Sequence, residues 1–183
     1  MVDVLFLTDS QTWDNPDEYG YYFSKLVFHM IEEAGKEGNE GVFGALVVHP
    51  GERLTRALRR WRRGDIQILD VNLHGYTASD LTVNGAVITH KEFCDALMAS
   101  GMYQNISVKV ELTGCNQNPA DFEGYLRDTF DVDINFAGLP GAYYHGPMTW
   151  NKILGYPGGT ENHQGRVIFK RYARYYPNSV DLK

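Results

Sequence analysis

Short, continuous apolar runs alternate with amphipathic segments along the first 136 residues, and this alternation is the strongest constraint on the fold. Apolar runs of this length, bounded by polar residues, are typical of strands buried on both faces of a sheet. The segments between them carry apolar residues at helical spacing. Strands are expected at residues 2–9, 41–49, 66–75 and 106–115 and from 132 onward, and helices at 21–38, 50–65, 90–100 and 118–130.

This order of elements predicts an α/β fold with an open, mostly parallel central sheet and helices on both faces. Asn84-Gly85 also predicts a small hairpin within residues 81–89. Asn118 and Pro119 are expected as the N-cap and first residue of a helix. A last strand-like run covers residues 165–176. The chain has 183 residues and is 43% hydrophobic, which suits one well-cored domain over 1–183.

The charge and the cysteine content argue against several classes of protein. The formal net charge of −6 disfavours a general nucleic-acid or anionic-membrane binder, and no apolar run approaches the ~20 residues of a bilayer span. The start, MVDVLFLTDSQ, lacks the basic residues and cleavage site of a signal peptide. Cys94 and Cys115 make no disulfide framework. We therefore expect reduced thiols in the cytoplasm, or in the cytosol of a cell into which the protein is delivered.

Several expected strands end in residues whose side chains could take part in catalysis or binding. The functional crevice of a parallel sheet lies beyond the carboxyl ends of its strands. The first strand is expected to end at Thr8-Asp9, the third at His74-Gly75 and the fourth at Gly114-Cys115. A histidine and a cysteine are thus expected on the same rim of the sheet.

This pair of residue types suits nucleophilic catalysis. A thiol needs a neighbouring base to react near neutral pH, and an imidazole can then protonate the leaving group. Acyl transfer also needs donors for the oxyanion, which the backbone N–H groups of Gly75 and Cys115 can supply. Taken alone, His-Gly is most often a turn and a lone cysteine a small buried hydrophobe. Their expected positions on neighbouring strand ends favour catalysis, whereas Cys94, inside an expected helix, is interpreted as a core residue.

The strand ends VNLHG and ELTGC, with a helix between them, resemble the caspase-like cysteine peptidases of clan CD. The Gly-Cys pair looks most like the self-processing cysteine-protease domains of large bacterial toxins. The resemblance implies a three-layer sandwich and a cysteine endopeptidase that cleaves proteins or its own precursor through a thioester intermediate. It implies Cys115 as the nucleophile, His74 as the general base and acid, and the backbone N–H groups of Gly75 and Cys115 as the oxyanion hole.

The resemblance also implies where a peptide substrate binds. An extended peptide would add to the sheet edge beside the fifth strand, where residues 137–145 supply the expected contacts. Thr113 stands where metacaspases and paracaspases carry an acid that helps select a basic P1 residue, and it tolerates the apolar P1, commonly Leu, of the toxin domains. The acidic loop from Asp9 keeps Arg or Lys at P1 as the second choice. The expected substrate-binding residues are Asp9, Thr113, Gly138, Leu139, Tyr143 and Tyr144.

Two basic groups stand out in this acidic chain. The arginines between residues 53 and 63 are most simply the solvated face of a helix, and a second group lies within residues 166–174. The related toxin domains are activated by inositol hexakisphosphate, and such groups could hold that anion. No other cofactor is expected, and no metal, because the chain lacks closely spaced metal-ligand motifs.

Two alternatives stay open. Tyr76 stands where many relatives have a second glycine or a histidine, which leaves room for a catalytically silent caspase-like binding or regulatory module. An unrelated flavodoxin-like, nucleotide-binding protein would show the same alternation of strands and helices, with the histidine and cysteine coincidental. Fast alkylation of Cys115 that depends on His74 would distinguish the enzyme, and a nucleotide or flavin retained on purification would indicate the flavodoxin-like protein.

Overall fold

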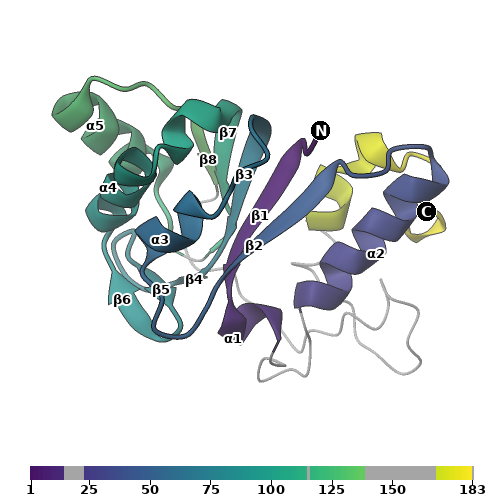
Figure 1. The fold of residues 1–183 in the computed structure, drawn as a ribbon, viewed down its shortest axis with the longest axis horizontal. Coiled ribbons are helices and arrows are strands. Elements are labelled where there is room, and N and C mark those ends of the chain that lie inside the picture. The colour runs from purple at the N-terminus through teal and green to yellow at the C-terminus, as the bar shows by residue number, and fades with distance from the viewer. Residues whose placement is uncertain (15–22, 115, 139–167, 183) are drawn as a thin grey trace. The chain divides into compact units, whose positions relative to one another are not determined.

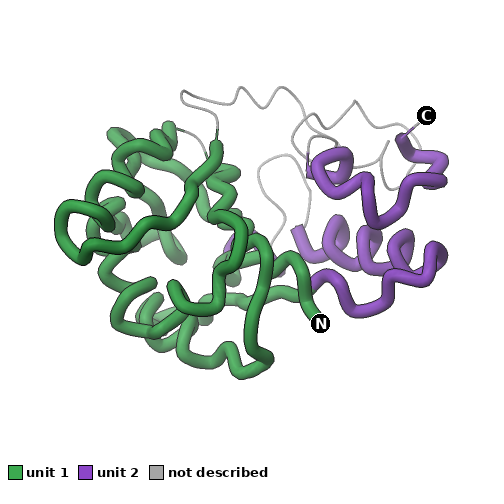
Figure 2. Tube along the Cα trace, turned by 90° about the horizontal axis from the view of Figure 1, so that it is seen from above, with its two compact units in different colours: residues 1–10, 44–143 green, residues 11–43, 144–183 purple. Residues whose placement is uncertain are grey.

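The computed structural model describes residues 1–14, 23–114, 116–138 and 168–182. The chain forms two compact units, which are coloured separately in Figure 2. The first unit comprises residues 1–10 and 44–143, and the second comprises residues 11–43 and 144–183. The candidate residues that follow the strand ends all belong to the first unit.

A five-stranded sheet forms the centre of the first unit. Its strands lie in the order β2-β1-β3-β7-β8. β1, β3, β7 and β8 run parallel, with Thr8 beside Asn72, Val71 beside Leu112, and Leu112 beside Gly138. The strands are β1 (Val4–Asp9), β2 (Phe43–Val48), β3 (Ile66–Asn72), β7 (Ile106–Leu112) and β8 (Phe136–Gly138). The predicted α/β fold with a mostly parallel central sheet is confirmed.

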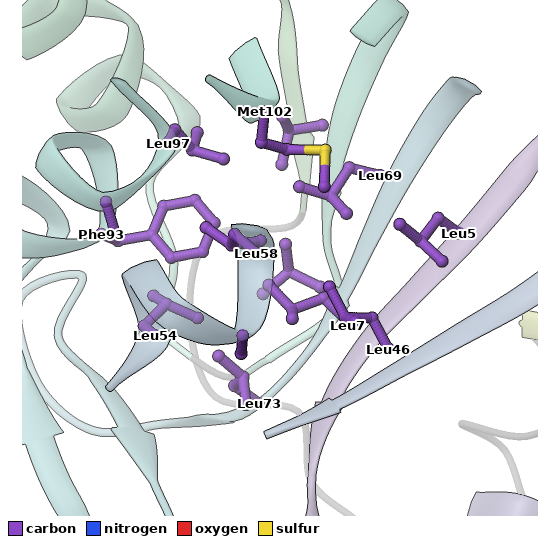
Figure 3. Close-up of a cluster of buried hydrophobic side chains, with 14 of the residues drawn as sticks. Leu5, Leu7, Leu46, Leu54, Leu58, Leu69, Leu73, Phe93, Leu97 and Met102 are labelled. Carbon is purple, nitrogen blue, oxygen red and sulfur yellow. The ribbon is translucent and has the colours of Figure 1, made fainter. Parts of the chain in front are cut away.

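The helices of the first unit lie on one face of this sheet (Figure 1): α3 (Leu54–Arg59), α4 (His90–Ser100) and α5 (Pro119–Phe130). Alternate strand residues point toward these helices and are buried, as the period of two in a strand requires. Figure 3 shows Leu7 and Leu69 of the sheet beside Leu58 of α3 and Phe93 and Leu97 of α4. This apolar core holds the strands in register, and their carboxyl ends therefore meet at one edge.

Local signals in the sequence account for the helix ends near the site. The Thr89 hydroxyl accepts a hydrogen bond from the backbone N–H of Glu92 at the start of α4, and Gly101 ends that helix with φ 79°. The Asn118 side chain accepts from the N–H of Ala120, and Pro119 is the first residue of α5. Both predictions for residues 118 and 119 are confirmed. The short 3₁₀ helix η1 (Met102–Asn105) leads from α4 into β7.

A small antiparallel sheet, β4-β5-β6, follows the central strand β3. β5 (Leu81–Val83) and β6 (Ala86–Ile88) pair directly. Asn84 and Gly85 close their turn with φ of 49° and 82°, the pair of positive φ values that a two-residue hairpin needs. The hairpin predicted within residues 81–89 is confirmed.

The third expected strand is shorter than predicted. β3 ends at Asn72, and His74-Gly75 form the separate strand β4, which pairs with β5 in the small sheet. The neighbours of β3 explain the change, because β1 ends at Asp9 and β7 ends at Leu112. Beyond those ends the hairpin offers backbone hydrogen bonds that the central sheet does not. The histidine therefore lies just past the strand tip rather than on it.

Other boundaries also differ from the prediction. The fourth strand, expected to reach residue 115, ends at Leu112, and the fifth, expected from 132, begins at Phe136. The helix expected over 50–65 is shorter than predicted: only α3 is helical, and the chain turns immediately after it. There the Arg60 guanidinium reaches back to Glu52 at 2.8 Å, and the Trp61 indole donates to the carbonyl of Gly64. These side-chain bonds favour a turn over further helix.

The second unit is built around α2 (Phe23–Lys36), which lies within the helix predicted over 21–38. The strand expected over 165–176 is wrong for its described part, because residues 168–171 are helical and η2 (Ala173–Tyr175) is a 3₁₀ helix. Ile168, Phe169, Tyr172 and Tyr176 are all buried, a spacing that fits a helical face rather than a strand. The remaining short elements are α1 (Ser10–Trp13) and η3 (Val180–Leu182).

Polar contacts tie the C-terminal segment to α2 within the second unit. His29 Nε2 lies 2.6 Å from Asp181 Oδ2, and the His29 ring stacks on Phe169 with centroids 5.3 Å apart. Just past the end of α2, Asn178 Nδ2 donates to Glu37 Oε2 at 3.0 Å. Residues 178–181 therefore lie along one side of α2.

Candidate functional site

The candidate residues follow the carboxyl ends of adjacent parallel strands in the first unit. His74 lies two residues after the end of β3, and Gly114 lies two residues after the end of β7. β3 and β7 are neighbours in the sheet, so the two chain segments leave it side by side. The predicted nucleophile Cys115 lies outside the described residues, as do the predicted substrate-binding residues Leu139, Tyr143 and Tyr144.

Gly114 brings the segment after β7 against the His74-Gly75 strand. An ideal Cβ placed on Gly114 would lie 2.5 Å from the carbonyl oxygen of Leu73 and 3.1 Å from the backbone nitrogen of Gly75. Only glycine allows the two backbones to approach so closely. Gly114 is bonded to Cys115 and Gly75 is bonded to His74. This contact therefore joins the sequence neighbours of the two predicted catalytic residues.

Hydrogen bonds also connect the loop after Gly75 to the chain beyond position 115. Asn116 Nδ2 donates to the carbonyl of Tyr76 at 2.6 Å, and Gln117 Nε2 donates to the carbonyl of Asp80 at 3.1 Å. Asn116 itself has φ 58°, a left-handed conformation that asparagine tolerates better than most residues. The chain is thus held to the 73–80 segment on both sides of Cys115.

Ser79 is a buried residue that bonds to several parts of these loops. Its backbone N–H donates to the carbonyl of Asn116 at 3.2 Å, and its hydroxyl accepts from the N–H of Asn118 at 3.0 Å. The same hydroxyl donates to Asp121 Oδ2 at 2.7 Å. A single buried serine therefore joins the loop after β4 to the start of α5.

His74 has the exposure that a proton-transfer residue needs, since its side chain faces solvent. Its carbonyl accepts a hydrogen bond from the Thr82 hydroxyl at 3.4 Å, and its pairing with Thr82 fixes its backbone in β4. Among the described residues, none forms a hydrogen bond with its imidazole. The ring can therefore take a partner from the segment around residue 115 without breaking one of these contacts.

Thr113, a predicted substrate-binding residue, is buried and faces the carboxylate of Asp70. The Thr113 hydroxyl donates to Asp70 Oδ1 at 2.8 Å, and Asn72 Nδ2 donates to the same oxygen at 2.6 Å. A buried carboxylate needs such donors to offset its lost hydration. Sequence reasoning missed Asp70 because it lies inside an apolar run. The expected role of Thr113 in P1 selection stays a prediction.

Asp9, the second predicted determinant of P1 selection, is 1% exposed. Its carboxylate accepts a hydrogen bond from the backbone N–H of Asn84 at 2.8 Å. Asn84 in turn donates to the carbonyl of Val48 and accepts from the Ser10 hydroxyl. Asp9 therefore anchors the hairpin turn to the end of β1, and any contact with substrate stays a prediction.

Gly138 is the one predicted substrate-binding residue of the 137–145 segment that the structure describes. It ends β8, beside Leu112 of β7. An ideal Cβ on Gly138 would lie 2.9 Å from the Leu112 carbonyl oxygen. Glycine is required at this position by the approach of β7, independently of any bound peptide.

Cys94 lies in the core, as predicted. It is 0% exposed, and its thiol points to the carbonyl of Phe122 at 3.7 Å. Burial, and to a smaller extent the charge of Asp95, raise the pKa of the Cys94 thiol to about 12. A thiol with this pKa is almost wholly protonated at neutral pH and is a poor nucleophile. Cys94 is therefore not a candidate for a reactive thiol.

The raised pKa of Cys94 predicts a loss of stability in alkali. The unfolded thiol ionises near pH 9.0, whereas the folded thiol keeps its proton to about pH 12. The native state therefore binds more protons than the unfolded state between these values, and the free energy of unfolding falls as the pH rises through them. We expect a loss of about 1.4 kcal/mol from this residue between about pH 8 and about pH 10.

Urea unfolding of the wild type and of Cys94→Ala under reducing conditions, at both pH values, measures this effect. The variant should lose about 1.4 kcal/mol less than the wild type over the same interval. The difference between the two losses cancels the contribution of tyrosine ionisation, because both proteins have the same tyrosines. An equal loss in both would mean that the Cys94 proton does not contribute.

The two basic groups of the sequence lie in different units. Arg60 is paired with Glu52, and Arg59 donates to the carbonyl of Ala99. The other arginines of this group are exposed: Arg53, Arg56, Arg62 and Arg63. In the second group Arg174 lies over the ring of Tyr175 at 4.7 Å, and Arg166 lies outside the described residues. Binding of inositol hexakisphosphate stays a prediction.

Neither the scan against protein-family models nor the search of curated proteins finds a match to this chain. The likeness to caspase-like peptidases therefore stays a prediction from the sequence. Within the described part of the chain, no helix is long and apolar enough to span a membrane. The same part contains no cluster of three His, Cys, Asp or Glu side chains able to hold a metal ion.

Sequence reasoning identified Asn118 only as a helix N-cap, and it missed the other polar residues that connect the two loops: Ser79, Asn116, Gln117 and Asp121. A signal was present, since serine and asparagine are common in turns and at helix starts. That signal indicates a turn at each position but not which turns bond to each other. The pairing depends on β3 and β7 being neighbours in the sheet.

Proposed function

We propose that the chain is a caspase-like cysteine endopeptidase in which Cys115 is the nucleophile and His74 is the general base and acid. The observation that carries the proposal is the approach of Gly114 to Gly75, with an ideal Cβ on Gly114 only 3.1 Å from the Gly75 nitrogen. The hydrogen bonds from Asn116 to Tyr76 and from Gln117 to Asp80 support it from the other side of position 115.

The proposed reaction proceeds through a thioester. His74 takes the Cys115 proton, and the sulfur attacks the scissile carbonyl carbon to form a C–S bond. The carbonyl electron pair moves to oxygen, where the backbone N–H groups of Gly75 and Cys115 stabilise the charge. Collapse of this intermediate breaks the C–N bond, and His74 protonates the leaving amine. Water, deprotonated by His74, then attacks the thioester, which releases the carboxylate product and restores the thiol.

The proposed substrate is an extended peptide, in another protein or in a precursor of this chain, that adds to β8. Leu is the first expectation for P1 because Thr113 carries no charge, and Arg or Lys is the second. The buried carboxylate of Asp70 accepts a hydrogen bond from Thr113 at 2.8 Å, which supports a basic P1 as the second choice. We propose action in a cytosol, either that of the producing cell or that of a cell that receives the protein.

A second candidate function has one observation in its favour. Read in chain order, the central strands follow the sequence 2-1-3-4-5, which flavodoxin-like proteins also use, with ligands at the switch point between the first and third strands. The short helix α1 follows β1 directly, with Ser10 as its first residue, and the loop lacks the spaced glycines of a phosphate-binding turn. A nucleotide or flavin absorbance in the purified protein would favour this candidate.

Thiol labelling tests the peptidase proposal without knowledge of the substrate. We expect iodoacetamide to label Cys115 at least about tenfold faster than Cys94 near neutral pH, because burial protects Cys94 and the imidazole promotes the Cys115 thiolate. His74→Ala should slow the labelling of Cys115 by at least about tenfold. Peptide mapping by mass spectrometry assigns the label to each cysteine.

His29→Ala is a matched control, since His29 belongs to α2 in the second unit, where it is bonded to Asp181, and its loss should leave the labelling of Cys115 unchanged. Slow labelling of Cys115 at a rate independent of His74 would contradict the proposed dyad. Fast labelling without any peptide cleavage would favour the silent binding module.

A further inference from the structure

We infer that Ser79 and Asp121 are positioning residues that hold the His74-Gly75 strand in its working place against the chain around Cys115, an inference that rests on the proposed peptidase function. Neither residue is expected to touch substrate. Their hydrogen bond, 2.7 Å long between Ser79 Oγ and Asp121 Oδ2, spans from the loop after the histidine to the helix after the cysteine.

The loop that carries Ser79 is strained. Ala78 and Ser79 have φ values of 50° and 67°, and successive left-handed residues other than glycine are unfavourable. Such conformations persist where surrounding contacts impose them, and they are often found near functional sites. The loop closes on itself through the bond from the Tyr76 N–H to the Asp80 carbonyl at 2.8 Å. Without an external restraint, we expect it to relax.

The restraint comes from α5, which is anchored in the core. Phe122 and Leu126 of this helix are fully buried, and Asp121 lies in its first turn. The Ser79 hydroxyl accepts from the Asn118 N–H and donates to Asp121, so it receives its position from the helix start. The hydroxyl therefore transmits the rigid position of α5 to the strained loop.

Movement of this loop would reach the predicted base directly. Gly75 pairs with Leu81, so residues 76–80 connect two paired strands of the small sheet. A relaxed loop would change the spacing between these strands and so the position of β4. Because proton transfer requires hydrogen-bond distance between base and nucleophile, a small displacement of His74 would uncouple it from Cys115.

A double-mutant cycle on the labelling of Cys115 by iodoacetamide tests the inference. In the wild type, His74→Ala should slow the labelling of Cys115 at least about tenfold. In the Ser79→Ala background, the same substitution should slow labelling less than about threefold, because the imidazole no longer reaches the thiol. Asp121→Asn keeps an oxygen that accepts from Ser79 and should retain the wild-type effect of His74. Asp121→Ala should behave as Ser79→Ala does.

Ser107→Ala is the matched control. The Ser107 hydroxyl donates to the carbonyl of Ile66 at 3.0 Å, and so also links β7 to β3, but at the opposite end of these strands. Its loss should leave the effect of His74→Ala intact. Equal effects of His74→Ala in the wild type and in folded Ser79→Ala would overturn the inference and leave the peptidase proposal standing.

The imidazole NMR signals of His74 give a readout that needs neither the thiol nor turnover. We expect Ser79→Ala to shift or broaden them and Ser107→Ala to leave them unchanged. Unchanged His74 signals in folded Ser79→Ala would overturn the inference whether or not the chain is a peptidase. If His74→Ala has no effect on the labelling of Cys115 in the wild type, the proposed function fails. This comparison is therefore made before any Ser79 variant is tested.

Discussion

Replacing Cys115 by alanine is expected to abolish peptide cleavage by this chain, with a loss of at least about 10⁴-fold in kcat. The physical reason is that no other thiol can replace it, because Cys94 is 0% exposed and burial raises its pKa to about 12. Digestion of a diverse peptide library, read by mass spectrometry, measures the effect. Each assay is run with and without inositol hexakisphosphate.

Cys94→Ala is the matched control and should keep every cut of the wild type. The residue before each cut decides between Leu and Arg or Lys at P1. Cuts that appear only with the polyphosphate would connect one of the basic groups to activation. If no cut depends on Cys115 in either condition, the chain is not a peptidase under these conditions, and the binding module becomes the better proposal.

Replacing Gly114 by alanine has the second large expected effect. The new Cβ would lie 2.5 Å from the Leu73 carbonyl oxygen and 3.1 Å from the Gly75 nitrogen, and both are backbone atoms that cannot rotate away. The strand end or β4 must therefore shift. We expect the free energy of unfolding to fall by roughly 2–3 kcal/mol, and labelling of Cys115 to lose its dependence on His74. Urea unfolding and iodoacetamide labelling measure the two effects.

Gly124→Ala is the control for this substitution. Gly124 lies inside α5, and an added Cβ would meet no atom within 4 Å. Alanine is favoured over glycine in a helix by roughly 0.5–1 kcal/mol, so this variant should be more stable than the wild type. A Gly114→Ala protein as stable as the wild type, with wild-type labelling of Cys115, would show that the close approach does not matter for the site.

The two parts of the first unit are stabilised by different interactions. Apolar contacts such as those of Leu69 and Phe93 hold the sheet against its helices. Near the strand ends, hydrogen bonds between polar side chains hold the chain in place, and the buried Ser79 and Asp70 both have side-chain partners. Hydrogen bonds are directional, whereas apolar contacts are not. Directional contacts can therefore set the relative position of two loops more sharply than the core can.

Much of the fold was readable from local patterns. The α/β class follows from the alternation of apolar runs and amphipathic helices. The hairpin at Asn84-Gly85 and the helix start at Asn118-Pro119 were predicted correctly, because positive φ at a turn and a side-chain cap at a helix start are short-range requirements. The burial of Cys94 was predicted correctly for a similar reason, since its neighbours mark the apolar face of one helix.

The errors occurred where partners distant in sequence decide the conformation. Residues 66–75 look like one apolar strand, yet the chain leaves the central sheet after Asn72 and His74-Gly75 pair with β5 instead. Residues 165–176 are rich in β-branched and aromatic residues and were predicted as a strand, yet Ile168, Phe169 and Tyr172 bury a helical face. An apolar run satisfies both conformations, and the available packing surface chooses between them.

The sequence by itself determined which residue types this chain can offer: a histidine and a cysteine that each follow an apolar run, with a glycine beside each. Only the tertiary structure decided that Gly114 lies against Gly75, and that Ser79 and Asp121 join the loops that follow them. The physical reason is that residue types are local properties, whereas the distance between two strand ends depends on the order of strands in the sheet. That order places β7 beside β3, and the proposed site depends on it.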